Sequence, residues 1–245
     1  MAKPLLILQL RPEDETSDNE YAAFLKYGAL DAQDTLRLRI ESSGIPGTLN
    51  LDEFSALIVG GSPFDISTPA GEKSAVQLKI EDDFSRLLDQ VVARDFPFLG
   101  ACSGNGLLGS YLGAPISRRY GEPVGCVSLQ VTEQGRQDPL LAGMPPGIDV
   151  LLGHKEACDE VPRGAVLLMT GAACPVQMFR VGNNVYATQF HPEGDAEGFA
   201  TRIQVYRHHG YFEPEQAEEL IATVNGVQTP WAQEILRRFV DRYLR

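Results

Sequence analysis

Apolar runs separated by glycine and proline mark the first hundred residues of the chain. Residues 4–10 form a mainly apolar run bounded by prolines, which is typical of a strand buried on both faces. Residues 35–40 alternate apolar and charged side chains and predict an edge or half-buried strand. Residues 54–59 and 96–99 are further apolar runs, and each is followed by glycine. The pattern predicts four strands in this part of the chain.

The stretches between these runs predict a long helix and a surface loop. Residues 13–20 are polar and acidic and predict the loop, followed by a short helix over 21–27. From residue 72 to residue 92 the apolar positions fall on one helical face: Val76, Ile80, Phe84, Leu87, Leu88 and Val91. Strand, helix and strand form a βαβ unit, in which the strands are parallel. We therefore expect an α/β fold with an open, mostly parallel sheet and ligands at the carboxyl ends of its strands.

The middle of the chain changes to short apolar runs between residues 116 and 188, and Gly182-Asn183-Asn184 is a hairpin signal. This pattern predicts an antiparallel excursion attached to the parallel sheet. The chain then becomes helical to its end, and Thr229 is a plausible cap before Pro230. The last helix carries an apolar stripe predicted to pack on the sheet: Trp231, Ile235, Leu236, Phe239, Val240, Tyr243 and Leu244. We expect one domain over residues 1–245, with a helical extension from about residue 195.

Composition narrows the class of protein. The 245 residues carry a formal net charge of −12, which argues against nucleic acid or an anionic membrane as the main partner. No apolar run approaches the roughly 20 residues of a membrane span, and the N-terminus does not have the pattern of a signal peptide. The four cysteines show no zinc-like spacing with the histidines, so we expect no metal, no other cofactor and a reducing, cytoplasmic setting.

Cys102 lies in a small-residue turn between a predicted strand and a predicted helix. The apolar run ends at Leu99, and helical spacing begins at Leu107 and stops at Gly113. Glycines on both sides of Cys102 allow close backbone approach. The N-terminus of a helix favours a thiolate over a thiol, so Cys102 is a candidate nucleophile. The alternative is a small cysteine that simply packs under a glycine-rich turn.

His191 also follows an apolar strand directly, and Glu193 lies two residues further on. A carboxylate can fix the tautomer of a histidine base and stabilise its charged form. Strand ends of this kind meet at one edge of a parallel sheet, so we expect His191 near Cys102. The backbone N–H groups of Gly60, Gly61 and Ser103 are candidate donors to an oxyanion.

Three motifs together resemble those of the class I (triad) glutamine amidotransferases, most of all free-standing members similar to the amidotransferase domain of GMP synthetase. They occur in the family's order: Leu57-Ile58-Val59-Gly60-Gly61-Ser62-Pro63, Gly100-Ala101-Cys102-Ser103-Gly104 and Gln189-Phe190-His191-Pro192-Glu193. The resemblance covers roughly residues 4–200 and implies a flavodoxin-like sheet with helices on both faces. It implies that Cys102 is the nucleophile, His191 the general base and acid, and Glu193 the residue that orients His191.

The resemblance also points to substrate-binding positions, with one departure. Gly153-His154-Lys155 resembles, in altered form, a segment that lies over the substrate's amino-acid end, so His154 and Lys155 are candidate contacts. His154 is equally well explained as a hydrogen-bonded loop histidine. Gly106 stands where the family usually has a glutamine that lines the substrate pocket. We expect a wider pocket at Gly106, able to accept a γ-glutamyl compound larger than glutamine.

The reaction implied is hydrolysis of the γ-amide of glutamine or of a γ-glutamyl compound through a thioester on Cys102. A synthetase that uses the ammonia would be a separate chain, because no nucleotide-binding stretch is present in the sequence. Two alternatives stay open. One is a catalytically weak binding or regulatory module. The other is a cysteine hydrolase of a different superfamily, which would need histidine where Ser103 stands.

Overall fold

A nine-stranded mixed sheet forms the centre of the protein in the computed structural model, which describes residues 3–244. The strand order is β2-β1-β3-β4-β11-β10-β9-β6-β7, and β5 and β8 form a separate small ribbon. The strands are β1 (Leu5–Gln9), β2 (Thr35–Arg39), β3 (Leu57–Val59), β4 (Phe98–Ala101), β5 (Ile116–Ser117), β6 (Glu122–Val131), β7 (Gly147–His154), β8 (Ala157–Cys158), β9 (Ala165–Thr170), β10 (Met178–Val181) and β11 (Val185–Thr188).

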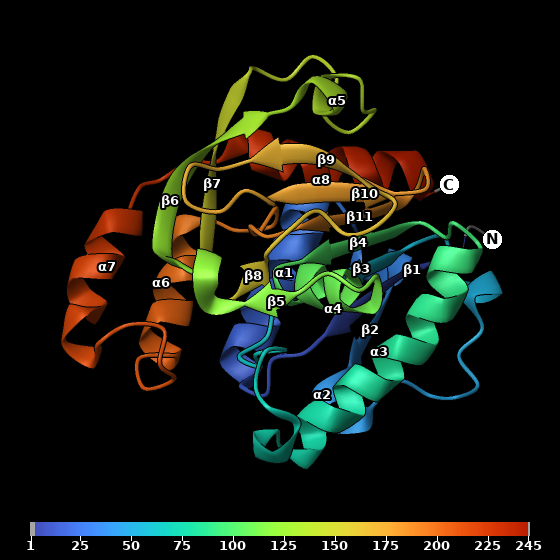
Figure 1. The fold of residues 1–245 in the computed structure, drawn as a ribbon, viewed down its shortest axis with the longest axis horizontal. Helices are drawn as coiled ribbons and strands as arrows, with labels where there is room; N and C mark the ends of the chain where they lie inside the picture. Colours follow the sequence, from blue (N-terminus) through green and yellow to red (C-terminus); the bar gives the residue numbers. More distant parts are fainter. Residues whose placement is uncertain (1–2, 245) are drawn as a thin grey trace.

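Helices cover both faces of this sheet (Figure 1). They are α1 (Asp14–Gly28), α2 (Ile40–Ser43), α3 (Ala75–Ala93), α4 (Ser103–Tyr111), α5 (Glu133–Arg136), α6 (Ala196–Val205), α7 (Ala217–Val224) and α8 (Pro230–Tyr243). Short 3₁₀ turns lie at Ala32–Asp34, Leu51–Glu53, Ala70–Glu72, Arg118–Tyr120 and Pro214–Gln216. The expected α/β, flavodoxin-like class is confirmed.

The sheet divides into a parallel and an antiparallel half. Strands β2, β1, β3, β4 and β11 run parallel to one another, whereas β10, β9, β6 and β7 continue in antiparallel pairs. The turn between β10 and β11 is the predicted hairpin, with Gly182 at a φ of 58°. The predicted antiparallel excursion is therefore confirmed, and β11 joins it to the parallel half.

Alternating side chains give the sheet two apolar faces. In β1, Leu5 and Ile7 pack in the core beneath α1 and α8, while Leu6 and Leu8 pack in the core beneath α3 and α4. All four are fully buried, as expected for a strand covered on both faces. A smaller apolar cluster joins β7 to α6 and α7. Within residues 3–244, no helix combines the length and the apolar character needed to cross a membrane.

The last helix packs on the sheet as predicted, although two details differ. Ile235, Leu236 and Phe239 are fully buried, but Trp231 keeps 41% of its surface exposed, so the stripe begins one turn later. Thr229 stands before the helix without capping it, because its hydroxyl donates instead to the Gly194 carbonyl, at 3.4 Å. In α3, Val76 is likewise exposed, and the buried face begins at Ile80.

The prediction of a surface loop over residues 13–20 is wrong. Helix α1 begins at Asp14, and Thr16, Ser17 and Glu20 are fully buried. The helix buries polar side chains that have hydrogen-bond partners: Glu20 accepts from Gln9 of β1, Ser17 accepts from Arg37 of β2, and Thr16 pairs with Tyr206. The apolar periodicity that would reveal a helix is therefore absent from this segment. The acidic residues of its first turn suit the positive end of the helix dipole.

Candidate active site

Cys102 occupies a strained turn at the carboxyl end of β4. Its φ of 51° and ψ of −94° lie outside the common regions for a residue with a side chain. Such a conformation costs on the order of 1–3 kcal/mol and persists only where the surrounding structure enforces it. The Cys102 N–H donates to the Thr188 carbonyl of β11, at 2.8 Å, and α4 begins at the next residue. The turn therefore presents the thiol at the rim of the sheet.

The surroundings of the thiol favour its neutral form. Burial raises the pKa of Cys102 to about 12, and the positive charge of Arg11 opposes this only in part. Cys158 and Cys174 are fully buried, and burial raises the pKa of each to about 12 as well. The prediction that Cys102 is a thiolate at rest is therefore wrong, because burial outweighs the helix N-terminus.

His191 and Glu193 form a buried pair next to this turn. His191 Nδ1 lies 2.7 Å from Glu193 Oε1, and the same oxygen accepts a hydrogen bond from Arg202 Nη2 of α6, at 3.0 Å. Because a carboxylate can only accept, Nδ1 carries the ring proton, and the lone pair of Nε2 points away from Glu193. His191 lines the same pocket as Cys102. The sequence prediction that His191 emerges near Cys102 agrees with this placement.

Burial and charge set the protonation of the pair. Burial lowers the pKa of His191 below its ordinary value, although Glu193 opposes the shift. Burial alone would raise the pKa of Glu193, but the His191 ring and Arg202 bring it well below the ordinary value. At neutral pH the site therefore holds a neutral imidazole beside an ionised carboxylate, which is the arrangement of a general base and its orienting group.

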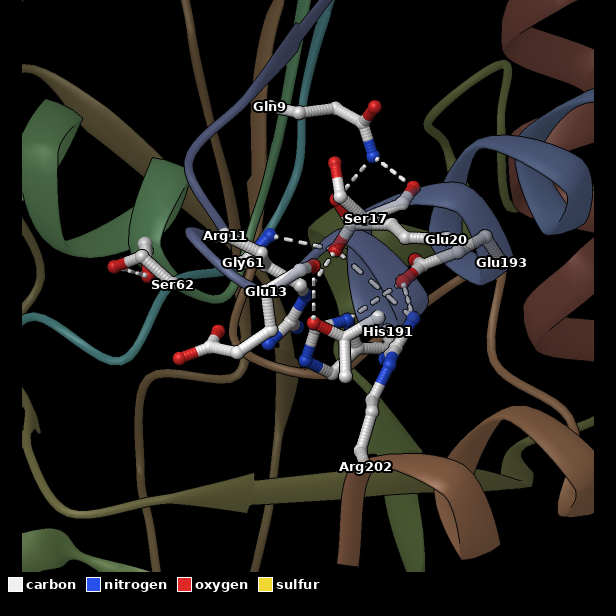
Figure 2. A network of polar contacts seen from close by, with 12 residues as sticks. Gln9, Arg11, Glu13, Ser17, Glu20, Gly61, Ser62, His191, Glu193 and Arg202 are labelled. Atoms are coloured by element: carbon white, nitrogen blue, oxygen red, sulfur yellow. Dashed lines mark hydrogen bonds and ion pairs between the residues drawn. The ribbon is translucent and has the colours of Figure 1, made fainter. Parts of the chain in front are cut away.

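A second buried ion pair, which the sequence analysis missed, lies behind His191 (Figure 2). Glu20 of α1 is fully buried and accepts from Arg11 Nε at 2.8 Å and from Gln9 Nε2 at 3.0 Å. Arg202 Nη2 lies 3.9 Å from Glu20, so the two ion pairs form one network. Arg11 lies two residues after the end of β1, and that position after a buried strand was the only sequence signal for it.

The predicted oxyanion donors differ in availability. Gly60 N–H donates to the Leu8 carbonyl within the sheet, at 3.0 Å, so the prediction that Gly60 is a donor is wrong. Gly61 N–H donates to Glu20 Oε1, at 3.1 Å, and is therefore occupied in this structure. Ser103 is the first residue of α4, where a backbone N–H has no acceptor within the helix. Ser103 is thus the predicted donor that the fold leaves available.

Gly106 lines a second pocket together with Cys102 and Ser103, but this pocket is not widened as predicted. A Cβ atom at Gly106 would lie 3.3 Å from Cδ1 of Ile66, whose side chain fills the space. Glu156 fixes the Ile66 loop, because its carboxylate accepts from Ile66 N at 2.6 Å and from Ser67 N at 2.8 Å. An apolar side chain therefore occupies the space that was expected to accept a larger substrate.

His154 and Lys155 line the same second pocket, and the polar atoms of both already have partners. Both ring nitrogens of His154 are engaged, with the Glu156 carbonyl at 3.0 Å and with Glu122 Oε2 at 3.0 Å. His154 thus has no ring nitrogen left for a substrate, and the alternative of a hydrogen-bonded histidine describes it better. Lys155 Nζ pairs with Asp65, at 3.0 Å, at the rim of the pocket.

Tyr211 separates the two pockets that meet at Cys102. It belongs to the segment after α6 and lines both pockets. Its hydroxyl donates to the Ser62 carbonyl, at 3.1 Å, and Lys155 Nζ lies 4.6 Å from the centre of its ring. The segment after α6 therefore reaches the pockets at Cys102, a feature that no sequence pattern indicated.

Two triplets of potential metal ligands occur among the described residues: Glu122, His154 and Cys174, and Glu20, His191 and Glu193. In the first triplet, both ring nitrogens of His154 already have hydrogen-bond partners. In the second, Arg11 and Arg202 neutralise the two carboxylates. Both triplets are accounted for as hydrogen-bonded or ionic networks.

Comparisons with known proteins agree on one family. The family model "Glutamine amidotransferase class-I" matches residues 48–207. The chain is 30% identical over 158 residues to the glutamine amidotransferase-like protein YfeJ of Salmonella typhimurium, a match that spans 63% of each chain. It is also 30% identical over 166 residues to a subunit of the glutamine-hydrolyzing GMP synthase of Thermococcus kodakarensis, and this match spans 65% of this chain and 80% of that one. The chain thus spans a little under two thirds of the YfeJ protein.

Solved structures share the fold at lower sequence identity. A glutamine amidotransferase from Thermotoga maritima superposes with a TM-score of 0.77 and 19% identity over 100% of both chains. A glutamine amido transferase from Methylobacillus flagellatus gives a TM-score of 0.72 at 19% identity, over 100% of this chain and 97% of the other. The whole of this chain, including the helices after residue 207, therefore has counterparts in that fold.

Proposed function

Because the chain belongs to the class-I glutamine amidotransferase family, we propose that it hydrolyses the γ-amide of glutamine or of a γ-glutamyl compound through a thioester on Cys102. One observation carries the proposal. The His191–Glu193 pair, 2.7 Å apart, opens onto the pocket that also holds the strained nucleophile turn. The Cys-His-Glu roles inferred from the sequence motifs are part of this proposal.

In the first half of the reaction, the Cys102 thiol attacks the γ-carbon while its proton passes to His191 Nε2. A neutral thiol beside a neutral imidazole suits such a coupled transfer, because neither charge has to exist at rest. The S–C bond forms and the carbonyl becomes an oxyanion, which Ser103 N–H stabilises. His191 then gives the proton to the γ-nitrogen, the C–N bond breaks, and ammonia or an amine leaves.

In the second half, water attacks the thioester with His191 again as the base. The proton returns to the sulfur as the S–C bond breaks, and glutamate leaves. Glu193 keeps Nδ1 protonated throughout and stabilises the ring when it is charged, which is the usual task of the third member of such a triad. Arg202 fixes Glu193 in turn.

The relatives that are named as GMP synthase subunits suggest a use for ammonia. We infer that a separate synthetase chain is a candidate partner for this protein, while a γ-glutamyl hydrolase acting alone is the other form of the same chemistry. One observation favours the rival candidate, a catalytically weak binding module: Gly61 N–H is occupied by Glu20. In that case turnover would be low even with Cys102, His191 and Glu193 in place.

The test is release of glutamate from glutamine and from a panel of γ-glutamyl amines and peptides. Cys102→Ser should reduce kcat by about 10³-fold or more, because a positioned nucleophile is lost. Cys126→Ser is the matched control, since Cys126 is exposed on β6, and it should retain full activity. Absence of hydrolysis of every compound by the wild-type protein, or full activity of Cys102→Ser, would overturn the proposal.

A further inference from the structure

One pocket at Cys102 also contains His191 and does not include Gly106 or Lys155. It is bounded by Cys102, His191, Arg11 and Arg202 and roofed by aromatic side chains of the segment after α6. The second pocket, with Gly106 and Lys155, lies on the other side of Cys102, and Tyr211 lies between the two. The nucleophile therefore faces two separate spaces.

The proposed chemistry matches each pocket to one part of the substrate. Gly106 and Lys155 lie where the family's motifs hold the amino-acid end of the substrate, so the glutamyl part belongs in their pocket. His191 must reach the departing nitrogen, so the leaving group belongs on the side of His191. Ammonia is small and needs no binding pocket of its own, whereas a substituted amine needs space and contacts with the protein. The pocket with Arg11 is therefore the leaving-group pocket.

The walls of this leaving-group pocket are mainly apolar. Phe199 and Ile203 of α6 form one side and are almost fully buried. Tyr206, Tyr211 and Phe212 close the pocket above them. Aromatic and aliphatic walls favour a ligand with an apolar body, because burying its surface removes apolar area from water.

Two arginines contribute to the polar part of the pocket. Arg11 is 4% exposed. Its Nε donates to Glu20, and its Nη1 donates to the Tyr206 hydroxyl, at 3.1 Å. Among the described residues, Arg11 Nη2 has no hydrogen-bond acceptor. A Cβ atom on Gly61 would lie 2.5 Å from Nη2 and 2.8 Å from His191 Cε1, so Nη2 lies beside the catalytic ring.

Arg202 also lines this pocket. Its Nε and Nη1 are buried, and neither has a partner among residues 3–244. A buried donor without an acceptor is costly, and an anionic ligand next to it would remove part of that cost. Two guanidinium groups thus border a small apolar pocket, and a carboxylate is the acceptor that matches their geometry.

Part of this pocket lies outside the segment that the family model matches. The model matches residues 48–207, whereas Arg11 precedes that range and Tyr211 and Phe212 follow it. Cys102 and His191 lie inside it, as do the α6 residues of the pocket wall. The proposed chemistry is therefore combined with some walls from outside the match, where specificity can differ between relatives.

We propose that this pocket binds the leaving amine, and that the amine carries both a carboxylate and an apolar side chain. The substrate class is then the γ-glutamyl derivatives of apolar amino acids. Arg11 Nη2 binds the carboxylate of the leaving group, and Phe199, Tyr206 and Phe212 surround its side chain. This proposal rests on the proposed function, because it deepens the same site.

The experiment compares two substrates that differ only in the carboxylate: γ-glutamyl-phenylalanine and γ-glutamyl-phenethylamide. In the wild-type protein kcat/KM should favour the first by about tenfold or more, as expected for a lost charged partner. Arg11→Met should bring the ratio close to one, and Arg11→Lys should retain part of the preference. The ratio is taken within each variant, so a general loss of activity does not affect it.

Calorimetry on the Cys102→Ala variant provides a readout without turnover. γ-Glutamyl-phenylalanine should bind more tightly than the phenethylamide, and Phe212→Ala in the same background should weaken both. Equal kcat/KM for the two substrates in the wild-type protein, or equal affinity in Cys102→Ala, would overturn the leaving-group assignment. If glutamine is hydrolysed but the carboxylate is ignored, only this inference fails. If the carboxylate is preferred in binding but nothing is hydrolysed, only the proposed function fails.

Discussion

Cys102 combines two features that oppose each other at the level of a single residue. Its backbone, at a φ of 51°, presents the sulfur at the sheet rim, while burial raises the pKa of the thiol to about 12. Only the thiolate reacts readily with small electrophiles. At rest the Cys102 thiol is therefore shielded, and in the proposed mechanism it becomes reactive when a bound substrate takes part in the proton transfer to His191.

This shielding predicts the order in which cysteines react. Iodoacetamide at neutral pH should modify Cys126 first, because it alone of the four cysteines is exposed, and Cys102 should react slowly. A Cys102 thiolate, which the sequence analysis favoured, would instead react first. A diazoketone analogue of glutamine should label Cys102 instead, since binding places its carbon against the sulfur. Peptide mapping by mass spectrometry, with Cys126→Ser as the control, measures both; rapid iodoacetamide labelling of Cys102 in that control would contradict the burial argument.

The His191–Glu193 pair predicts the acid limb of the pH profile. Activity requires neutral His191, so kcat/KM rises with pH through the pKa of His191, and burial places that pKa below the ordinary value. Glu193 raises the pKa of His191, so Glu193→Gln should move the limb to still lower pH. The variant should also lose about 10²–10⁴-fold in kcat, because the ring loses its orienting carboxylate.

Steady-state kinetics between pH 4 and pH 8 make this measurement. Glu197→Gln is the matched control, since Glu197 is an exposed glutamate on α6, and it should leave the profile unchanged. A limb that moves to higher pH in Glu193→Gln would mean that Glu193 does not act on His191 as an anion.

At the level of elements, α1 connects β1 to the active site through Glu20. This carboxylate holds Gln9, Arg11 and Gly61 N–H together, with distances of 2.8–3.1 Å. Glu20→Ala leaves Arg11 buried without its partner and should destabilise the protein by about 3–5 kcal/mol. Glu15→Ala, on the exposed face of the same helix, should change the stability by less than about 0.5 kcal/mol.

Urea unfolding measures both variants. The double variant Arg11→Met with Glu20→Leu should recover much of the lost stability, because a well-packed apolar pair can replace a buried ion pair. If Glu20→Ala proves no less stable than Glu15→Ala, the ion pair does not hold α1 in place.

Helix α4 and the Ile66 loop compete for the space at Gly106. Gly106→Gln should lower the free energy of unfolding by about 1–3 kcal/mol, because its Cβ would lie 3.3 Å from Ile66 Cδ1. Ile66→Ala should remove most of this penalty in the double variant, which a double-mutant cycle detects. Gly47→Gln is the control, since no atom lies within 4 Å of a Cβ there. Additive effects of the two substitutions would show that the side chains do not meet.

Across the whole molecule, the sequence predicted the elements that have a regular apolar pattern. It missed the residues whose positions depend on polar contacts. The buried runs of β1, β3, β4 and β11, with glycine turns after β3 and β4, were enough to predict the sheet and to bring Cys102 and His191 to one edge. The first two turns of α1 were not predicted as helix, because that helix buries Thr16, Ser17 and Glu20 instead of an apolar stripe. Arg11 and Tyr211 were not predicted as site residues for a related reason, because each reaches the site from a segment without periodicity.

The position of β11 between β4 and β10 has a consequence for how the protein is made. On the ribosome β1 to β4 emerge first, and the outer edge of β4 stays without a partner until residues 185–188 follow. An unpaired apolar strand edge invites pairing with other chains. Cys102 emerges early as well, long before His191. A nascent chain that stalls before β11 therefore exposes both an unpaired strand edge and an unburied thiol.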